Sequence, residues 1–113
     1  MTKVIYVKYD TCEQLINWIE HNGSVQYHYY DKIFDYREIL YTYNGGTIKV
    51  VNLNSRKIIT FKDYMYRLHN ILGPATFEFD KNNHEIKRRY FFKGKEINEL
   101  SWLVITSCQN DTE

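Results

Sequence analysis

Apolar and polar residues alternate along much of this chain, in short segments separated by turn-forming residues. Alternation with a period of two is typical of strands that bury one face. It is cleanest where Ala75, Phe77 and Phe79 alternate with polar neighbours. The segments that this pattern predicts as strands are 3–9, 24–29, 33–43, 47–53, 57–61, 75–79 and 87–93.

One segment near the N-terminus has the period of a helix instead. Its apolar residues recur at spacings of three and four, so they fall on one helical face. Either Asp10 or Thr11 offers a capping side chain at the start. Gly23 marks the end, because glycine tolerates the left-handed backbone of a helix cap. We therefore predict a helix over about residues 11–22. Its apolar face is formed by Cys12, Leu15, Ile16 and Ile19.

Turn residues between the strands predict antiparallel hairpins. Asn44-Gly45-Gly46 is a strong signal, because Asn-Gly accepts the positive φ angles of a tight turn. Asn54-Ser55-Arg56 predicts a second turn, and the polar segment 80–84 a third. Short strands joined in this way predict an antiparallel meander.

The second half contains one ambiguous segment and one further helix. Residues 62–72 fit either a helix or a strand, and Gly73-Pro74 ends whichever forms. After Gly94 has ended the last strand, Asn98 can cap a short C-terminal helix. The apolar residues of this helix are Leu100, Leu103 and Val104, with Trp102 beside them.

These elements predict an α+β fold: an N-terminal helix packed on a twisted antiparallel meander of five to seven strands, with a short C-terminal helix. The 113 residues fit a single domain over 1–113. Eleven tyrosines and six phenylalanines supply core volume. Because the hydroxyl group of a tyrosine favours contact with water, so many tyrosines suggest half-buried sheet faces.

Charge and cysteine content bear on location and partners. A net charge of +1 gives no electrostatic case for bulk binding of nucleic acid. The two cysteines, Cys12 and Cys108, are typical of reduced cytosolic thiols, and a disulfide between them stays open. Cys12 falls on the apolar helix face, which favours a core residue over a nucleophile. No apolar run reaches the length of a signal peptide or a membrane span. We expect a cytoplasmic protein, in the host cytoplasm if viral, with no membrane partner.

No arrangement of residues in the sequence points to catalysis. Neither a nucleophile elbow nor a phosphate loop nor a dinucleotide fingerprint occurs. The carboxylates Asp31, Asp35 and Glu38 lie close together, but they are more typical of a solvated strand edge than of an acid–base pair. We therefore expect no enzymatic activity, no cofactor and no bound metal. The four histidines have no metal-ligand spacing to one another or to a cysteine: His21, His28, His69 and His84.

The most distinctive candidate surface is the basic-aromatic strand at 87–93. Arginine and aromatic residues on a sheet can stack nucleobases, and the same residue types supply hot spots to protein interfaces. The segment lacks the Gly-aromatic-Gly pattern of common RNA-binding sheets. A simpler interpretation is a strand with Tyr90 and Phe92 inward and basic residues outward. The candidate residues of this surface are Lys87, Arg88, Arg89, Tyr90, Phe91 and Lys93.

A second candidate lies in the tyrosine-rich strand that follows the first helix. Tyr27 and His28 could hydrogen-bond a ligand there, but the pattern is more typical of a polar strand face. Together with Arg88 they could form a pocket for a small nucleotide.

About a quarter of the chain has an ordered set of motifs. In order they are Arg67-Leu68-His69, Gly73-Pro74-Ala75, a strand ending at Phe79-Asp80, a turn, the strand Tyr90-Phe91-Phe92, and Gly94-Lys95. This order resembles the hairpin repeat of MORN-like proteins, which are found in phages, giant viruses and some bacteria. Asn83 stands near the place of the family's turn glycine, and Asn reaches the same conformation at a higher cost. The resemblance implies a hairpin and a viral or mobile-element origin. It implies no activity, because the repeat is architecture.

The leading hypothesis is a small non-enzymatic protein-binding module whose partner is a host protein. One form is a stoichiometric inhibitor of a host or defence protein, of the anti-CRISPR type. Alternatives are nucleic-acid binding through 87–93 and sequestration of a small nucleotide. Exposed edge strands also permit a homodimer.

Overall fold

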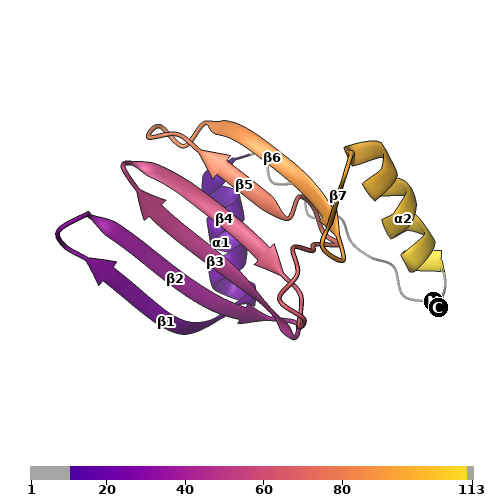
Figure 1. Ribbon diagram of the computed structural model, residues 1–113, viewed down its shortest axis with the longest axis horizontal. Coiled ribbons are helices and arrows are strands. Elements are labelled where there is room, and N and C mark those ends of the chain that lie inside the picture. The colour runs from indigo at the N-terminus through magenta and orange to yellow at the C-terminus, as the bar shows by residue number, and fades with distance from the viewer. Residues whose placement is uncertain (1–10, 112–113) are drawn as a thin grey trace.

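The computed structural model describes residues 11–111, and the side chains of 11–107. Two helices and a seven-stranded antiparallel sheet make an α+β fold, which confirms the predicted class (Figure 1). The strand predicted over 3–9 lies outside the described residues. The elements are α1 (Cys12–Asn22), β1 (Ser24–Asp31), β2 (Tyr36–Tyr43), β3 (Gly46–Leu53), β4 (Arg56–Lys62), β5 (Thr76–Phe79), β6 (Glu85–Phe92), β7 (Lys95–Ile97) and α2 (Glu99–Asp111).

Helix α1 begins and ends where the sequence predicts. Thr11 is its N-cap, and the Thr11 hydroxyl accepts the backbone N–H of Gln14 at 3.1 Å. Gly23 is its C-cap, but with φ of −92° the left-handed conformation that we predicted is wrong. Glycine fits there for a steric reason, because a Cβ would lie 3.0 Å from both the Ile19 carbonyl oxygen and the Tyr41 Cβ.

Strands β1 to β7 lie side by side in chain order, and each neighbouring pair is antiparallel. The predicted Asn-Gly turn is confirmed, since Asn44 and Gly45 have φ of 49° and 82° between β2 and β3. Asn54 and Ser55 make a similar two-residue turn, with φ of 53° and 63°. The predicted meander is therefore present, and β7 adds a short strand that the sequence did not reveal.

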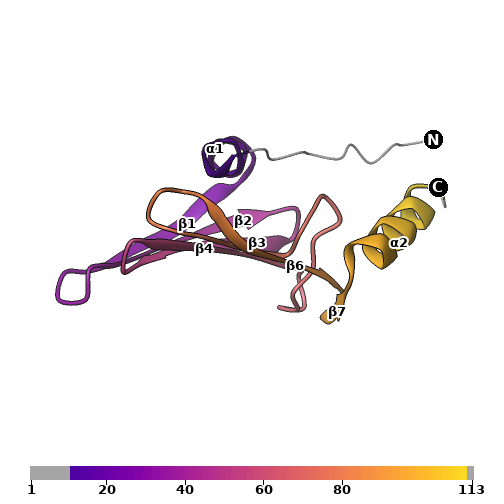
Figure 2. The same ribbon diagram turned by 90° about the horizontal axis from the view of Figure 1, so that it is seen from above.

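The two faces of the sheet differ in what covers them. Both helices lie on one side of the sheet, and the other side carries neither of them (Figure 2). We call the side that carries neither helix, with respect to the described residues, the open face. The side of the sheet that faces the helices is called the helix side below, and the core lies between it and α1. Cys12 is buried in this core, as predicted. The core residues of the sheet are Tyr41, Ile48, Val50, Ile59, Phe61, Phe77 and Phe79.

The segment between β4 and β5 is neither a helix nor a strand, so both predicted alternatives for 62–72 are wrong. Regular pairing is limited to a single bridge between Lys62 and Leu68. The Asp63 side chain accepts the backbone N–H groups of Met65 and Arg67 at 2.9 and 3.0 Å. Such side-chain bonds to the backbone compete with regular structure and hold an irregular loop in place.

Helix α2 is fastened to the sheet by one large side chain. Asn98 caps it as predicted, since its Oδ1 accepts the backbone N–H of Ser101 at 2.7 Å. Trp102 is 3% exposed, lies 5.2 Å from the Tyr90 ring, and donates its indole N–H to the Asn70 carbonyl at 2.7 Å. The other apolar residues of the predicted helix point away from the core and are exposed: Leu100, Leu103 and Val104.

Candidate functional site: a tyrosine cluster on the open face

The basic residues of β6 are largely engaged by carboxylates. Arg88 binds Glu85 through its Nε, at 2.7 Å. Arg89 binds Glu96 through two nitrogens, at 2.7 and 2.8 Å. Each guanidinium therefore has a counter-charge before any phosphate arrives, which weakens the case for a nucleic-acid surface.

The aromatic residues of β6 are buried on both sides of the sheet. Tyr90 packs against Trp102 on the helix side. Phe91, on the other side, is 5% exposed, and the Arg89 guanidinium lies 5.1 Å from its ring centre. Tyr90 and Phe91, which the sequence suggested as part of a partner surface, are therefore buried in this structure. Lys87 and Lys93 remain exposed.

Tyr27 and His28 lie on opposite faces of β1. The strand register places Tyr27 beside Leu40 on the open face, and His28 beside Ile39 on the helix side. Arg88 lies on β6, and four strands separate β6 from β1. The three residues that we considered for a nucleotide pocket are therefore not brought together.

A cluster that the sequence did not reveal lies on the open face, where β1 meets β2. The two carboxylate oxygens of Glu38 each accept a tyrosine hydroxyl, one from Tyr27 and one from Tyr36. Lys49 Nζ lies 3.9 Å from Glu38 Oε2. The ring of Tyr29, whose strand position is opposite Glu38, meets the Tyr36 ring edge-on at 6.2 Å. We call Tyr27, Tyr29, Tyr36 and Glu38 the tyrosine cluster.

Hydrogen bonding fixes the charge state of this cluster. The Tyr27 and Tyr36 hydroxyls hold the pKa of Glu38 below its usual range. In return, the bond to Glu38 raises the pKa of Tyr36 to about 12 and also raises the pKa of Tyr27. At neutral pH the carboxylate is therefore ionised and both phenols are protonated. This combination suits positioning of the rings, whereas proton transfer needs a pKa close to the working pH.

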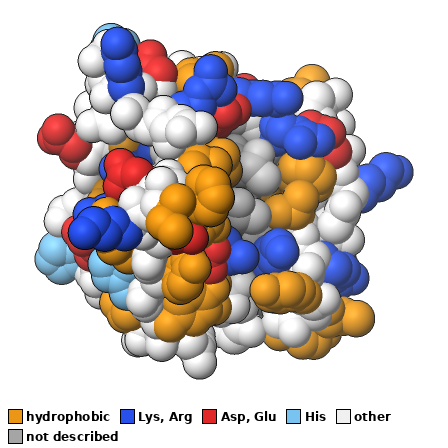
Figure 3. Space-filling model, turned by 60° about the vertical axis from the view of Figure 1, so that its left-hand side comes forward, with side chains coloured by type: hydrophobic (Ala, Val, Ile, Leu, Met, Phe, Trp, Pro, Cys, Tyr) orange, Lys and Arg blue, Asp and Glu red, His pale blue; other side chains and the backbone are white. Residues whose placement is uncertain are grey.

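The cluster presents aromatic rings whose positions are already set. Tyr29 is 51% exposed although its ring is held against Tyr36. Figure 3, seen from the side of the β1–β2 hairpin, shows hydrophobic side chains in patches among charged ones (Figure 3). The Lys49 amine beside the cluster offsets the negative charge of Glu38. Rigid aromatic area at low entropic cost is what binding surfaces use.

The remaining candidates for chemistry have structural roles. Asp31 accepts two backbone N–H groups of its own turn, and Asp35 lies in that turn with φ of 49°. Burial raises the pKa of the Cys12 thiol, which fits its place in the core. Among the residues that the structure describes, no three His, Cys, Asp or Glu side chains are grouped to hold a metal ion.

Comparisons of this chain with protein-family models, with curated proteins and with solved structures find no match. The MORN-like resemblance of 67–95 therefore stays a prediction. In that stretch β5 and β6 form a hairpin, and Asn83 takes the left-handed conformation with φ of 64°. Within the described part of the chain, neither helix is long and apolar enough to cross a membrane.

Proposed function

We propose that this protein is a small non-enzymatic protein-binding module that presents its open face, with the tyrosine cluster, to a partner protein. The observation that carries the proposal is the attachment of two tyrosines to Glu38, with Tyr29 packed beside them, on a face that neither helix covers. Tyrosine is among the residue types that supply most of the energy in protein interfaces. Rings that are already fixed lose little freedom on binding.

The surroundings of the cluster favour a partner surface of low charge. One row of the open face runs from Tyr29 through Glu38, Val51 and Ile58 to Glu78. Its centre is aliphatic, and Ile58 is exposed. An apolar centre with polar groups around it is the usual anatomy of a protein interface. Nucleic acid is the weaker candidate, because the two arginines of β6 are already bound by carboxylates.

A stoichiometric inhibitor of a host or defence protein, of the anti-CRISPR type and acting in the host cytoplasm, is the specific form of this proposal. The small size and the MORN-like resemblance to phage proteins support it. A homodimer is compatible with it, because β1 is an edge strand whose residues Ser24 to Tyr30 are all exposed.

Two adjacent tyrosines provide a matched test. Tyr29 lies on the open face, while Tyr30 points to the helix side, where Arg37 lies 4.1 Å from its ring centre. Their exposed fractions are similar, at 51% and 44%. The tagged protein, Tyr29→Ala and Tyr30→Ala would each be used to capture proteins from a lysate of the source cell and of its host. Circular dichroism would first establish that all three are folded.

We expect one protein to be captured in a fixed molar ratio by the unaltered chain and by Tyr30→Ala. Tyr29→Ala should weaken that complex by about tenfold or more, as loss of a hot-spot tyrosine does. The isolated complex would then be tested for inhibition of the partner's activity. Equal weakening by both substitutions, or capture of no specific protein, would contradict the proposal.

A further inference from the structure

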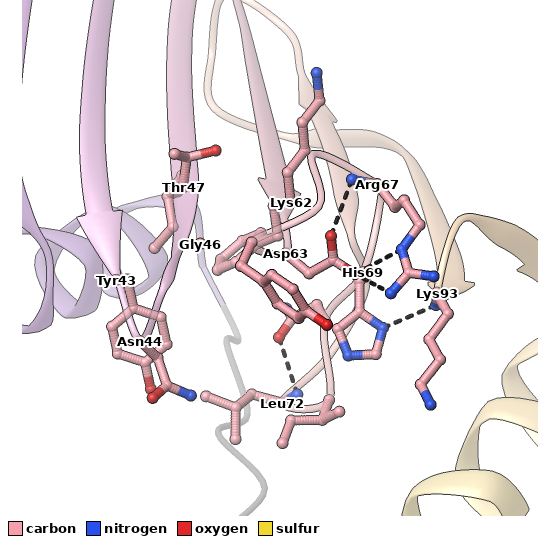
Figure 4. A pocket seen from close by; sticks show the side chains of 15 residues that line it. Tyr43, Asn44, Gly46, Thr47, Lys62, Asp63, Arg67, His69, Leu72 and Lys93 are labelled. Carbon is pink, nitrogen blue, oxygen red and sulfur yellow. Dashed lines mark hydrogen bonds and ion pairs between the residues drawn. The ribbon is translucent and has the colours of Figure 1, made fainter.

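A cavity of about 400 Å³ lies away from the tyrosine cluster, between the β2–β3 turn and the irregular loop at 63–72 (Figure 4). Sites for small molecules in proteins have volumes of about 300–1,000 Å³. The floor of the cavity is formed by the core residues Ile48 and Phe61. Tyr43 stands on one side, and the loop supplies the opposite wall with His69 and Leu72. Its volume therefore suits a small molecule.

The loop that forms this wall is tied down before any ligand binds. Asp63 receives two backbone N–H groups and the Arg67 guanidinium. Asn70 is buried; its side chain donates to the Pro74 carbonyl at 2.9 Å and accepts the Leu72 N–H at 2.9 Å. A wall held in this way needs little ordering when a ligand arrives, which favours binding.

His69 offers the cavity one hydrogen-bond donor. Its Nδ1 accepts the backbone N–H of Lys93 at 2.9 Å, and its ring lies 5.0 Å from the Phe92 ring. Since Nδ1 accepts, the neutral ring carries its hydrogen on Nε2. Burial lowers the pKa of His69, so this neutral form prevails at neutral pH. The edge of the imidazole ring opposite Lys93 is turned toward the cavity (Figure 4). Within the described residues, Nε2 of His69 has no hydrogen-bond partner.

The charged groups around the cavity favour an anion. The Lys62 amine lies over the Tyr66 ring, 4.1 Å from its centre, so the cations that remain at the cavity are Arg67 and Lys93, against the single carboxylate of Asp63. That carboxylate is already bound by Arg67, at 2.9 Å. The described residues place no carboxylate within 4.0 Å of the Lys93 amine. The local charge is therefore positive, with Lys93 at the rim able to meet a ligand charge.

We infer that this cavity binds a small aromatic anion, a flat ring that carries one carboxylate or phosphate group. The anionic group is held by the Nε2–H of His69 and by the Lys93 amine, and the ring lies between Tyr43 and Leu72. An aromatic wall such as Tyr43 favours a flat ring because the two rings can stack. The site is separate from the open face, so it can exist whether or not the open face binds a protein.

Isothermal titration with four probes tests this inference and identifies the anionic group. The anions are 4-hydroxybenzoate and adenosine monophosphate, and their neutral counterparts are 4-hydroxybenzamide and adenosine. We expect at least one anion to bind at a single site with Kd below about 1 mM, and its neutral counterpart to bind at least about tenfold more weakly. Binding by neither anion, or equal affinity of anion and neutral counterpart, would overturn the inference.

Matched variants locate the binding. Lys93→Asn keeps a residue that tolerates the left-handed backbone at this position, where φ is 49°, and should weaken anion binding about fivefold. Lys95→Asn removes the same charge two residues away, on β7 and outside the cavity, and should change the affinity less than twofold. His69→Phe keeps a ring against Phe92 but removes the Nε2–H donor, and Leu72→Trp fills the cavity. Both variants should abolish anion binding, and thermal melting should show that both are folded. Equal weakening by Lys93→Asn and Lys95→Asn, or undiminished binding by Leu72→Trp, would place the anion elsewhere.

Discussion

Trp102 should carry most of the attachment of α2, and its loss can be estimated from its contacts. Trp102→Phe keeps an aromatic ring near Tyr90 but removes the indole N–H that binds the carbonyl of the buried Asn70. Taking the partner from a buried polar group costs about 1–3 kcal/mol. Trp102→Ala also empties the space of the ring, and such a truncation costs about 3–5 kcal/mol. A domain of this kind has only about 5–15 kcal/mol of unfolding free energy, so the alanine variant should be visibly destabilised.

Urea denaturation followed by circular dichroism measures both changes. Leu100→Ala is the control on the same helix: Leu100 is 72% exposed, and its truncation should change the free energy of unfolding by less than about 0.5 kcal/mol. Amide exchange should also show that α2 opens more readily in the Trp102 variants while β3 and β4 keep their protection. The reasoning fails if Trp102→Ala costs no more than Leu100→Ala, since another contact would then hold α2.

Three further predictions follow from the fold and its charges. Glu38→Gln should return the pKa of Tyr36 from about 12 toward 10, measured by an ultraviolet absorbance titration in which Tyr36→Phe assigns the signal. An unchanged titration would mean that the hydrogen bond between Tyr36 and Glu38 is absent. Burial lowers the pKa of His69 in the folded protein, so the unfolded chain binds the proton more readily and the free energy of unfolding should fall as the pH drops below 6.5. His69→Phe should remove this pH dependence above the range where carboxylates titrate. An equal slope of unfolding free energy against pH in both proteins would refute the prediction. Gly46→Ala should prevent folding or lower the melting temperature strongly, because a Cβ would lie 2.1 Å from the Lys62 carbonyl oxygen; a near-native melting curve would count against the close approach of β3 and β4 there.

Local chemistry in the sequence predicts much of the fold. Asn44 and Gly45 fix a tight hairpin because few other residues take positive φ at both turn positions. Thr11 and Asn98 mark the starts of α1 and α2 because their side chains accept the otherwise unpaired N–H groups of the first turn. Local sequence patterns do not predict the conformation of 62–72, because hydrogen bonds of the Asp63 side chain hold that segment in place.

The candidate site depends on strand register, which alternation alone does not give. A β-bulge lies between Val25 and Tyr27, so Val25 pairs with Tyr41 on the helix side while Tyr27 falls on the open face. One extra residue in a strand reverses which face the following side chains occupy. The meeting of Tyr27 with Glu38 follows from that shift, and neither residue signals it in the sequence. The His69 cavity is equally hidden, because its walls come from segments far apart in the chain.

The central claim, that the open face meets a partner protein, is tested most directly by photo-crosslinking from two adjacent positions. The photoreactive residue benzoylphenylalanine resembles tyrosine in shape and would replace either Tyr29 or Tyr30 in cells that contain the partner. Position 29 lies on the open face and position 30 on the helix side of the same strand. We expect irradiation to give one discrete heavier product from position 29 and little or none from position 30. Equal products from both positions, or a product from position 30 alone, would contradict the claim.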